Sequence, residues 1–279
     1  MINSLILIGY DRSGTSAISR TLSKHPDIEL IFRPFNGGPI RKKMYKILDA
    51  SNTSNEDCNF FSNLEKGVFD ETYVISQWHY KYSTIRKQFH PRNLHVIITN
   101  INHFSVPWVN KHYPDIEQWA IWRDPIEILN SCIKNEFFGK WYKDAFDELE
   151  DTLVKHEFLK KEFNNKFLLA KKSNYVVKTA FLISIRNYVL FKHIPKHKII
   201  DYNIFERDPN TALFELLKYF KVKYHDFKGY LNQDLNSISS VDGFKPREKK
   251  PIILEERDLI IAKDFFKPLY ELYNTKFDD

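Results

Sequence analysis

The stretch LILIGYDRSGTS (residues 5–16) decides the fold. Its four leading apolar residues fit a buried strand, and the glycines that follow fit a loop running into a helix. Gly9, Gly14 and Ser16 match the phosphate-binding pattern G-x-x-x-x-G-K-[ST], but Thr15 stands where that pattern has its lysine. The stretch therefore predicts a phosphate-binding loop that lacks magnesium-triphosphate chemistry. A plain Gly-Ser turn between a strand and a helix is the alternative.

Arg12 places a positive charge inside this loop. A guanidinium can bind an oxyanion through two parallel hydrogen bonds. The backbone amides of Gly14, Thr15 and Ser16, at the start of a helix, can bind the remaining oxygens. Together with Ser13, these residues are predicted to bind a nucleotide phosphate.

A second segment, WAIWRDPIEILNS (residues 119–131), has the form of a strand that ends in Arg123 and is followed by a helix. Pro125 fits the first turn of that helix. Ser131 then lies about two turns along it and faces back toward the strand end. Taken alone, Arg123 also fits a surface cation and Ser131 a filler inside the helix.

These segments, together with LSKHPD (residues 22–27), resemble the sulfotransferases that use 3′-phosphoadenosine 5′-phosphosulfate (PAPS). The resemblance implies a three-layer, P-loop-like α/β fold with a central, mostly parallel sheet and helical insertions. It implies that the loop from Arg12 to Ser16 binds the 5′-phosphosulfate. It also implies that Arg123 and Ser131 hold the 3′-phosphate.

Two weaker matches extend the resemblance to about residue 251. Tyr202, at the end of a strand-like run, resembles the family's tyrosine near the adenine, although a core tyrosine fits the sequence nearly as well. Lys245 and Arg247 stand in the place of the late basic loop that closes on the 3′-phosphate. Such a charge cluster is also typical of a solvated loop.

The catalytic base is left open by the resemblance. Many family members carry a glutamate soon after the His-Pro-Asp stretch, but residues 32–36 here are FRPFN. Cytosolic members carry a histidine after the strand that precedes Arg-Asp-Pro. In this chain Asn100 stands at that place, and His103 follows it. An imidazole suits proton removal near neutral pH, so His103 is the first candidate, His79 the second and Glu29 the third. Each histidine also fits a structural role.

Composition permits this interpretation. The 279 residues are 43% hydrophobic and 15% aromatic, which is enough for a packed core and argues against disorder. We expect one sulfotransferase domain over residues 1–279, with a helical cap at about 137–172. The net charge of +6 favours anionic ligands, but no pattern typical of nucleic-acid binding occurs. Cys58 and Cys132 imply neither a disulfide framework nor a metal site. No apolar run reaches the ~18 residues of a membrane span, so a cytoplasmic protein is expected.

Alternating apolar runs and helical patterns predict parallel βαβ units, with ligands at the carboxyl ends of the strands. Strands are expected at residues 5–8, 73–76, 94–99, 118–122 and 198–201, and helices at 14–24, 41–48, 126–134, 146–172, 179–193, 211–220 and 255–273.

The sequence-based hypothesis is a PAPS-dependent sulfotransferase that transfers a sulfuryl group to a hydroxyl or amine. The acceptor stays open among a glycan, a lipid-linked sugar, a small phenol and a peptide. Arg33, at the place of the family glutamate, is a candidate for binding an anionic acceptor or the sulfate. The alternatives are a P-loop nucleotide kinase, which Thr15 counts against, and a nucleotide-binding protein without catalysis. The oligomeric state is not predicted.

Overall fold

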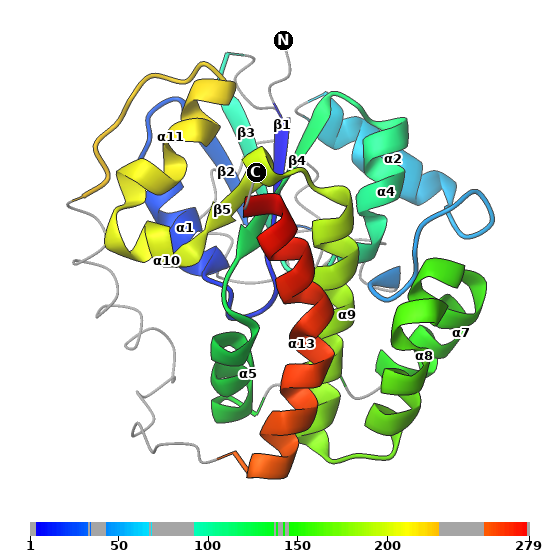
Figure 1. Cartoon of the computed structure of the whole chain (residues 1–279). Helices are drawn as coiled ribbons and strands as arrows, with labels where there is room; N and C mark the ends of the chain where they lie inside the picture. The colour runs from blue at the N-terminus through cyan, green and yellow to red at the C-terminus, as the bar shows by residue number, and fades with distance from the viewer. Residues whose placement is uncertain are drawn as a thin grey trace.

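A five-stranded parallel sheet with helices on both faces forms the centre of the protein (Figure 1). The computed structural model describes residues 4–32, 34, 43–66, 68, 92–136, 138, 142, 145–228 and 254–277. The strands, in the spatial order β2-β3-β1-β4-β5, are β1 (Ser4–Ile8), β2 (Ile28–Phe32), β3 (Leu94–Thr99), β4 (Ile116–Trp122) and β5 (Ile199–Asp201). The predicted α/β fold class is therefore confirmed.

Twelve helical elements are assigned within the described residues. They are α1 (Thr15–Leu22), α2 (Asn55–Glu65), η4 (His103–Ser105), α4 (Val106–His112), α5 (Pro125–Lys134), α7 (Ala145–Lys155), α8 (Glu157–Lys171), α9 (Tyr175–His193), η5 (Lys196–Lys198), α10 (Tyr202–Arg207), α11 (Pro209–Tyr219) and α13 (Glu256–Phe277).

The central strand β1 is buried on both faces, as a parallel sheet requires. Successive side chains of a strand point to opposite faces. Accordingly, Leu5 and Leu7 pack with α1, α10 and α11, whereas Ile6 and Ile8 join the larger core formed with α9 and α13. All four side chains are 0% exposed. Since all strands run parallel, the loops after β1, β3, β4 and β5 meet at one edge of the sheet.

Helix α13 joins two of these loops to the helical layer. The hydroxyl of Tyr270 donates to Asp124 Oδ2 at 3.1 Å, and that of Tyr273 donates to Asp201 Oδ2 at 2.5 Å. These two carboxylates cap the N-termini of α5 and α10. The Tyr273 ring also stacks on Trp122, with centroids 3.9 Å apart. The last turns of the chain thereby fix the directions in which the chain leaves β4 and β5.

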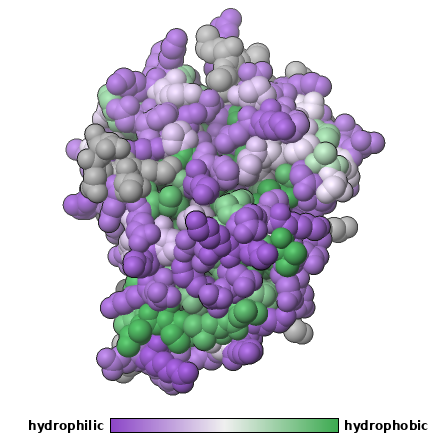
Figure 2. Space-filling view, turned by 45° about the vertical axis from the view of Figure 1, so that its right-hand side comes forward, coloured by the Kyte–Doolittle hydropathy of each residue, from purple (hydrophilic) through white to green (hydrophobic). Residues whose placement is uncertain are grey.

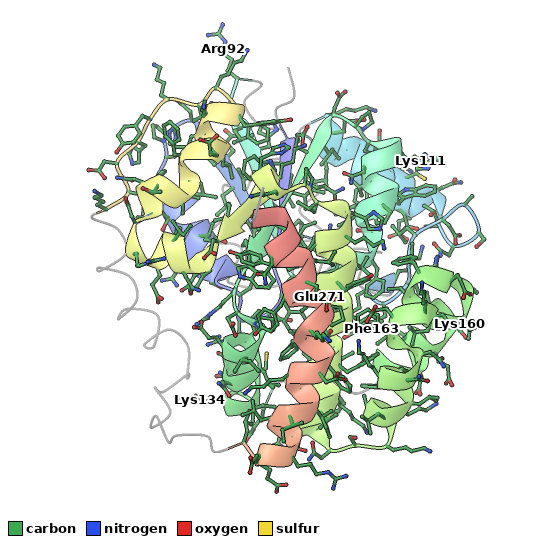
Figure 3. The ribbon with its side chains drawn as sticks, viewed as in Figure 1. Arg92, Lys111, Lys134, Lys160, Phe163 and Glu271 are labelled. Atoms are coloured by element: carbon green, nitrogen blue, oxygen red, sulfur yellow. The ribbon has the colours of Figure 1, made fainter. Side chains whose placement is uncertain are left out.

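The surface is mainly hydrophilic on the face seen in Figure 2, with hydrophobic side chains gathered in a band across its lower part. Lys111, Lys134 and Lys160 point outward from α4, α5 and α8, whereas Phe163 lies between helices (Figure 3). None of the described helices is long and apolar enough to cross a membrane.

Four of the five expected strands match β1, β3, β4 and β5, with boundary differences of no more than two residues. The expected strand at 73–76 lies outside the described residues. Strand β2 was not predicted, and neither were helices α2, α4 and α10. The helix expected at 41–48 is wrong over residues 44–48, which form a turn and irregular chain.

The single helix expected at 146–172 is also wrong, because the chain breaks at His156 into α7 and α8. His156 has extended backbone angles (φ −118°, ψ 98°) and is the N-cap of α8. A single extended residue interrupts the helical hydrogen bonds, so the apolar spacing, which continues across the break, did not indicate it.

Replacing Phe163 by alanine should lower the free energy of unfolding by about 3–5 kcal/mol, because the substitution opens a cavity where a fully buried ring packs against Phe181 and Tyr188. Urea denaturation measures the loss. Leu168→Ala, on the same helix with its side chain 48% exposed, is the matched control and should change stability by less than about 0.5 kcal/mol. Equal stabilities would show that α8 does not pack as described.

Candidate functional site

The chain turns sharply after β1. Ser13 N donates to the carbonyl of Tyr10 at 3.0 Å, which closes a turn with Arg12 at φ +70°. A positive φ is uncommon for a residue with a side chain. Gly14 follows at φ +97° and caps α1, whose first amides point back over the turn. This geometry matches the predicted loop, which presents amides at a helix N-terminus.

Arg12 is held at the exposed side of the turn by residues from a distant part of the chain. Its Nε donates to Ser131 Oγ at 2.9 Å. The Arg123 guanidinium donates through Nη1 to the backbone carbonyl of Arg12 at 2.8 Å. The two segments singled out in the sequence therefore meet, although Ser131 contacts the arginine of the first segment. Asp124 caps α5 by accepting from Ile126 N at 2.8 Å, and this cap positions Ser131.

Tyr202 brings the third predicted segment to the same place. Its ring lies over Gly14, where an added Cβ would come within 2.0 Å of the ring, and the Arg123 guanidinium lies 4.8 Å from the ring centroid. Burial raises the pKa of Tyr202, and Glu206 adds to this, while the charges of Arg123, Arg20 and Arg12 oppose it. Arg123 therefore lies against this ring beside the loop, and the charges of Arg20 and Arg12 also act on its hydroxyl.

Arg123 also pairs with Glu127, whose Oε2 accepts from Arg123 Nε at 2.9 Å. Arg123 directly precedes the N-cap of α5 and lies four residues before Glu127, whose side chain is 49% exposed. A half-exposed pair of this kind contributes little to stability. A bound anion can therefore replace Glu127 as the partner of Arg123 at little cost in stability.

The buried carboxylate of Asp11 stabilises the turn through hydrogen bonds. Asp11 Oδ1 accepts from the Asn100 amide at the end of β3, and Asp11 Oδ2 accepts from the Tyr142 hydroxyl. The Cys132 thiol lies 3.9 Å from the Asp11 carbonyl, and burial raises the pKa of this thiol. Residues from three segments thus fix the turn.

His103 lies beside the turn on the α9 side of the sheet and is fully buried. Its ring meets the Tyr10 ring edge-on at 6.1 Å, and its Nδ1 accepts from Arg186 Nη2 at 3.2 Å. Because Arg186 can only donate, His103 Nδ1 carries no proton and Nε2 does. Burial, and then the charge of Arg186, hold the pKa of His103 well below its usual value. Helix η4 begins at His103, shortly after β3 ends at Thr99, and His103 therefore lies near the loop.

The remaining predicted residues fall in different places. Ser13 and Thr15 are buried, and Ser13 Oγ has no hydrogen-bond partner among the described residues. Glu29 pairs in register with His95, which is itself opposite Ser4 at the start of β1, so Glu29 lies at the other end of the sheet from the loop. His79, Arg33, Lys245 and Arg247 lie outside the described residues.

Several contributors to the site were not predicted. Arg20 lies one turn along α1 from Ser16, whose carbonyl accepts from Arg20 Nε at 3.1 Å. This i+4 spacing was visible in the sequence. Tyr142 and Arg186 gave no local signal, because their partners are 131 and 86 residues away.

Comparisons with known proteins do not assign a family. No protein-family model matches the chain, and no curated protein matches it in sequence. Within the described residues, no cluster of three or more His, Cys, Asp or Glu side chains could hold a metal ion. The function is therefore argued from the site itself.

Gly14→Ala should destabilise the protein by about 2–4 kcal/mol, because a Cβ at φ +97° is strained and collides with the Tyr202 ring. Urea denaturation gives the value. In a Tyr202→Ala background the collision is absent, so the same substitution should cost only about 1–2 kcal/mol. An unchanged cost in that background would mean that the ring does not pack on Gly14.

Proposed function

We propose that this protein is a PAPS-dependent sulfotransferase that transfers a sulfuryl group to a hydroxyl or amine of a glycan or small-molecule acceptor in the cytoplasm. The convergence of Arg12, Ser131, Arg123 and Tyr202 around the α1 N-terminus carries the proposal. These residues come from three distant segments and lie in contact with one another. The resemblance implies that all of them bind one cofactor. A nucleotide with phosphates at both ends of its ribose needs such a set of cations.

The residues present fit that cofactor. Ser13 Oγ is a buried hydroxyl without a partner among the described residues, at the loop where the 5′-phosphosulfate would bind. The amides at the start of α1 and the Arg12 guanidinium supply donors for its oxygens. Arg123 and Ser131 would hold the 3′-phosphate, and Tyr202 would lie against the adenine.

The cofactor supplies the sulfuryl group, and the protein supplies charge and orientation. Arg12 and the amides of Gly14, Thr15 and Ser16 would stabilise the negative charge that develops on the phosphate side of the breaking bond. The turn holds these donors in place before any ligand binds, because Asp11 is fixed by Asn100 and Tyr142. Such preorganisation is the largest electrostatic contribution that a site of this kind can make.

The catalytic base stays a prediction. His103 lies close enough to the loop to be considered, but its Nδ1 lone pair is engaged by Arg186. To accept a proton at Nδ1, His103 would have to give up this bond beside a positive charge. In the observed arrangement His103 offers Nε2–H as a donor. His79, the other predicted base, lies outside the described residues.

The same observation favours a second candidate function, a nucleotide-binding protein without transfer activity. Such a protein needs the donors around the loop and no base. Transfer of radiolabelled sulfate from PAPS to a set of hydroxyl and amine acceptors separates the two functions. Transfer above the level of an Arg12→Ala variant supports the enzyme, and tight binding of adenosine 3′,5′-bisphosphate without any transfer supports the binding protein.

Adenosine 3′,5′-bisphosphate should raise the melting temperature more than ATP with Mg²⁺ does, because a ligand stabilises the folded state according to its affinity. The reason is that Thr15 replaces the lysine of a triphosphate loop, whereas Arg12 and Arg123 meet beside the loop and Arg123 lies over the Tyr202 ring. Thermal unfolding followed by fluorescence measures both shifts. Equal or greater stabilisation by Mg-ATP would contradict the proposal and favour a kinase.

Arg123→Ala should weaken binding of adenosine 3′,5′-bisphosphate by about 1.5–3 kcal/mol, the range of a hydrogen bond to a charged group. Adenosine 5′-monophosphate lacks the 3′-phosphate, so its affinity should hardly change. Calorimetry gives both affinities. Glu127→Gln is the matched control. It removes the carboxylate that competes for Arg123 and should not weaken binding of the bisphosphate. If both nucleotides lose affinity alike, Arg123 acts only through its bond to the Arg12 carbonyl.

A further inference from the structure

Arg186, in the middle of α9, is 0% exposed. Its Nη2 donates to the Asn100 carbonyl and to His103 Nδ1. Among the described residues, its Nε and Nη1 have no hydrogen-bond partner. An arginine keeps its charge at all accessible pH values. Burial opposes this charge, whereas Tyr142, Tyr45, Tyr10 and the Asp11 carboxylate raise the pKa of Arg186. Buried N–H donors without acceptors are unfavourable, so these two nitrogens require an explanation.

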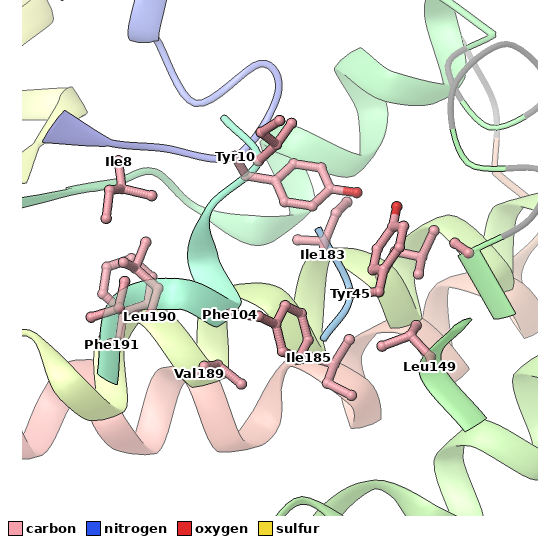
Figure 4. Packing of buried hydrophobic residues seen from close by; sticks show 14 of the residues in the cluster. Ile8, Tyr10, Tyr45, Phe104, Leu149, Ile183, Ile185, Val189, Leu190 and Phe191 are labelled. Atoms are coloured by element: carbon pink, nitrogen blue, oxygen red, sulfur yellow. The ribbon is translucent and has the colours of Figure 1, made fainter. Parts of the chain in front are cut away.

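Tyrosine rings surround the Arg186 guanidinium. The distances from its carbon to the ring centroids are 4.6 Å for Tyr10, 5.8 Å for Tyr45 and 5.9 Å for Tyr142. Cation–π contacts compensate part of the charge but satisfy none of its N–H groups. Among the described residues, the hydroxyls of Tyr10 and Tyr45 also have no hydrogen-bond partner. In Figure 4 these two hydroxyls point toward each other, and each ring lies at the edge of the α9 core.

The unsatisfied groups at this place are mostly donors. Arg186 Nε and Nη1 donate, and His103 Nε2 carries a proton because Nδ1 accepts from Arg186. The two tyrosine hydroxyls can donate as well, and Asn100 Oδ1 is an acceptor among them. The nearby Asp11 carboxylate accepts from Asn100 and Tyr142 and acts on Arg186 through its charge, but Arg186 Nε and Nη1 still lack an acceptor among the described residues. A group with several acceptor oxygens, such as an oxyanion, would satisfy several of these donors at once.

We propose that Arg186, with His103 and the hydroxyls of Tyr10 and Tyr45, binds an oxyanionic group carried by the acceptor, such as a carboxylate. Tyr10 and Asp11 directly precede Arg12, so this oxyanion site lies on the α9 side of the turn whose other side presents Arg12. The identification of the ligand as the acceptor rests on the proposed sulfotransferase function. The oxyanion site itself rests on the contacts of Arg186. The protein would then select acidic acceptors over neutral ones.

Inorganic sulfate is a suitable probe when the loop is first filled with saturating adenosine 3′,5′-bisphosphate. Under those conditions sulfate at ten times its Kd should raise the melting temperature by about 3 °C, and sodium chloride of equal ionic strength should not. Arg186→Lys keeps a charge near the Asn100 carbonyl but loses the guanidinium donors. It should bind sulfate at least about tenfold more weakly by calorimetry, which corresponds to one lost charge-assisted hydrogen bond.

Arg207→Met, which removes an exposed arginine on α10, is the matched control and should leave the sulfate response unchanged. A sulfate response that disappears once the bisphosphate is bound would overturn the oxyanion site, because the sulfate would then have occupied the loop. Unchanged sulfate affinity in Arg186→Lys would overturn it too.

Two further results separate this proposal from the proposed function. If the bisphosphate does not bind but sulfate still stabilises the wild type and not Arg186→Lys, the oxyanion site stands and the sulfotransferase function fails. If Arg186→Lys loses about tenfold in PAPS affinity but none in bisphosphate affinity, Arg186 binds the transferred sulfuryl group, and the assignment to the acceptor is overturned.

Discussion

The site depends on the way in which the Asp11 carboxylate is held. The amide of Asn100 and the hydroxyl of Tyr142 bind its two oxygens beneath the sheet edge. Asp11 is buried in this turn, whereas Arg12, the next residue, is exposed and has an unfavourable positive φ. The buried hydrogen bonds outweigh that strain, because leaving a carboxylate buried without donors would cost more.

Much of this arrangement could be predicted because the signals are local. Arg12, Gly14, Arg123 and Ser131 all lie within a few residues of a strand end. In a parallel sheet the carboxyl ends of neighbouring strands meet at one edge, so the order of motifs along the chain was enough to place them together. The pairing in detail was not predictable. Ser131 was expected to work with Arg123, but it binds Arg12, since the α5 register and the strained turn decide the contact.

The buried side of the site could not be predicted, because its contacts join residues that are far apart in the chain. The apolar spacing of α9 predicts a core helix, and it says nothing about where Arg186 points or what it meets. Tyr45 falls where a helix was expected, and the chain is irregular there. The edge strand β2 carries buried Glu29, which pairs with Asn93 and lies close to His95. Because the charged Glu29 interrupts this short apolar run, the hydrophobic pattern did not indicate a strand there.

The packing of residue 15 suits a threonine at the place where the phosphate-binding pattern has its lysine. The Thr15 side chain is 2% exposed, and a Cβ on Gly9 would lie 2.8 Å from its Cγ2, so this position packs against the start of the loop. A lysine there would have to displace the buried packing of this side chain. The cations at this edge of the sheet are instead Arg12 and Arg123, which are joined by the bond from Arg123 Nη1 to the Arg12 carbonyl, and Arg123 lies over the Tyr202 ring. Positive charge at the loop is thus supplied by arginines from two distant segments, and the proposed function requires a ligand with two separate anionic groups.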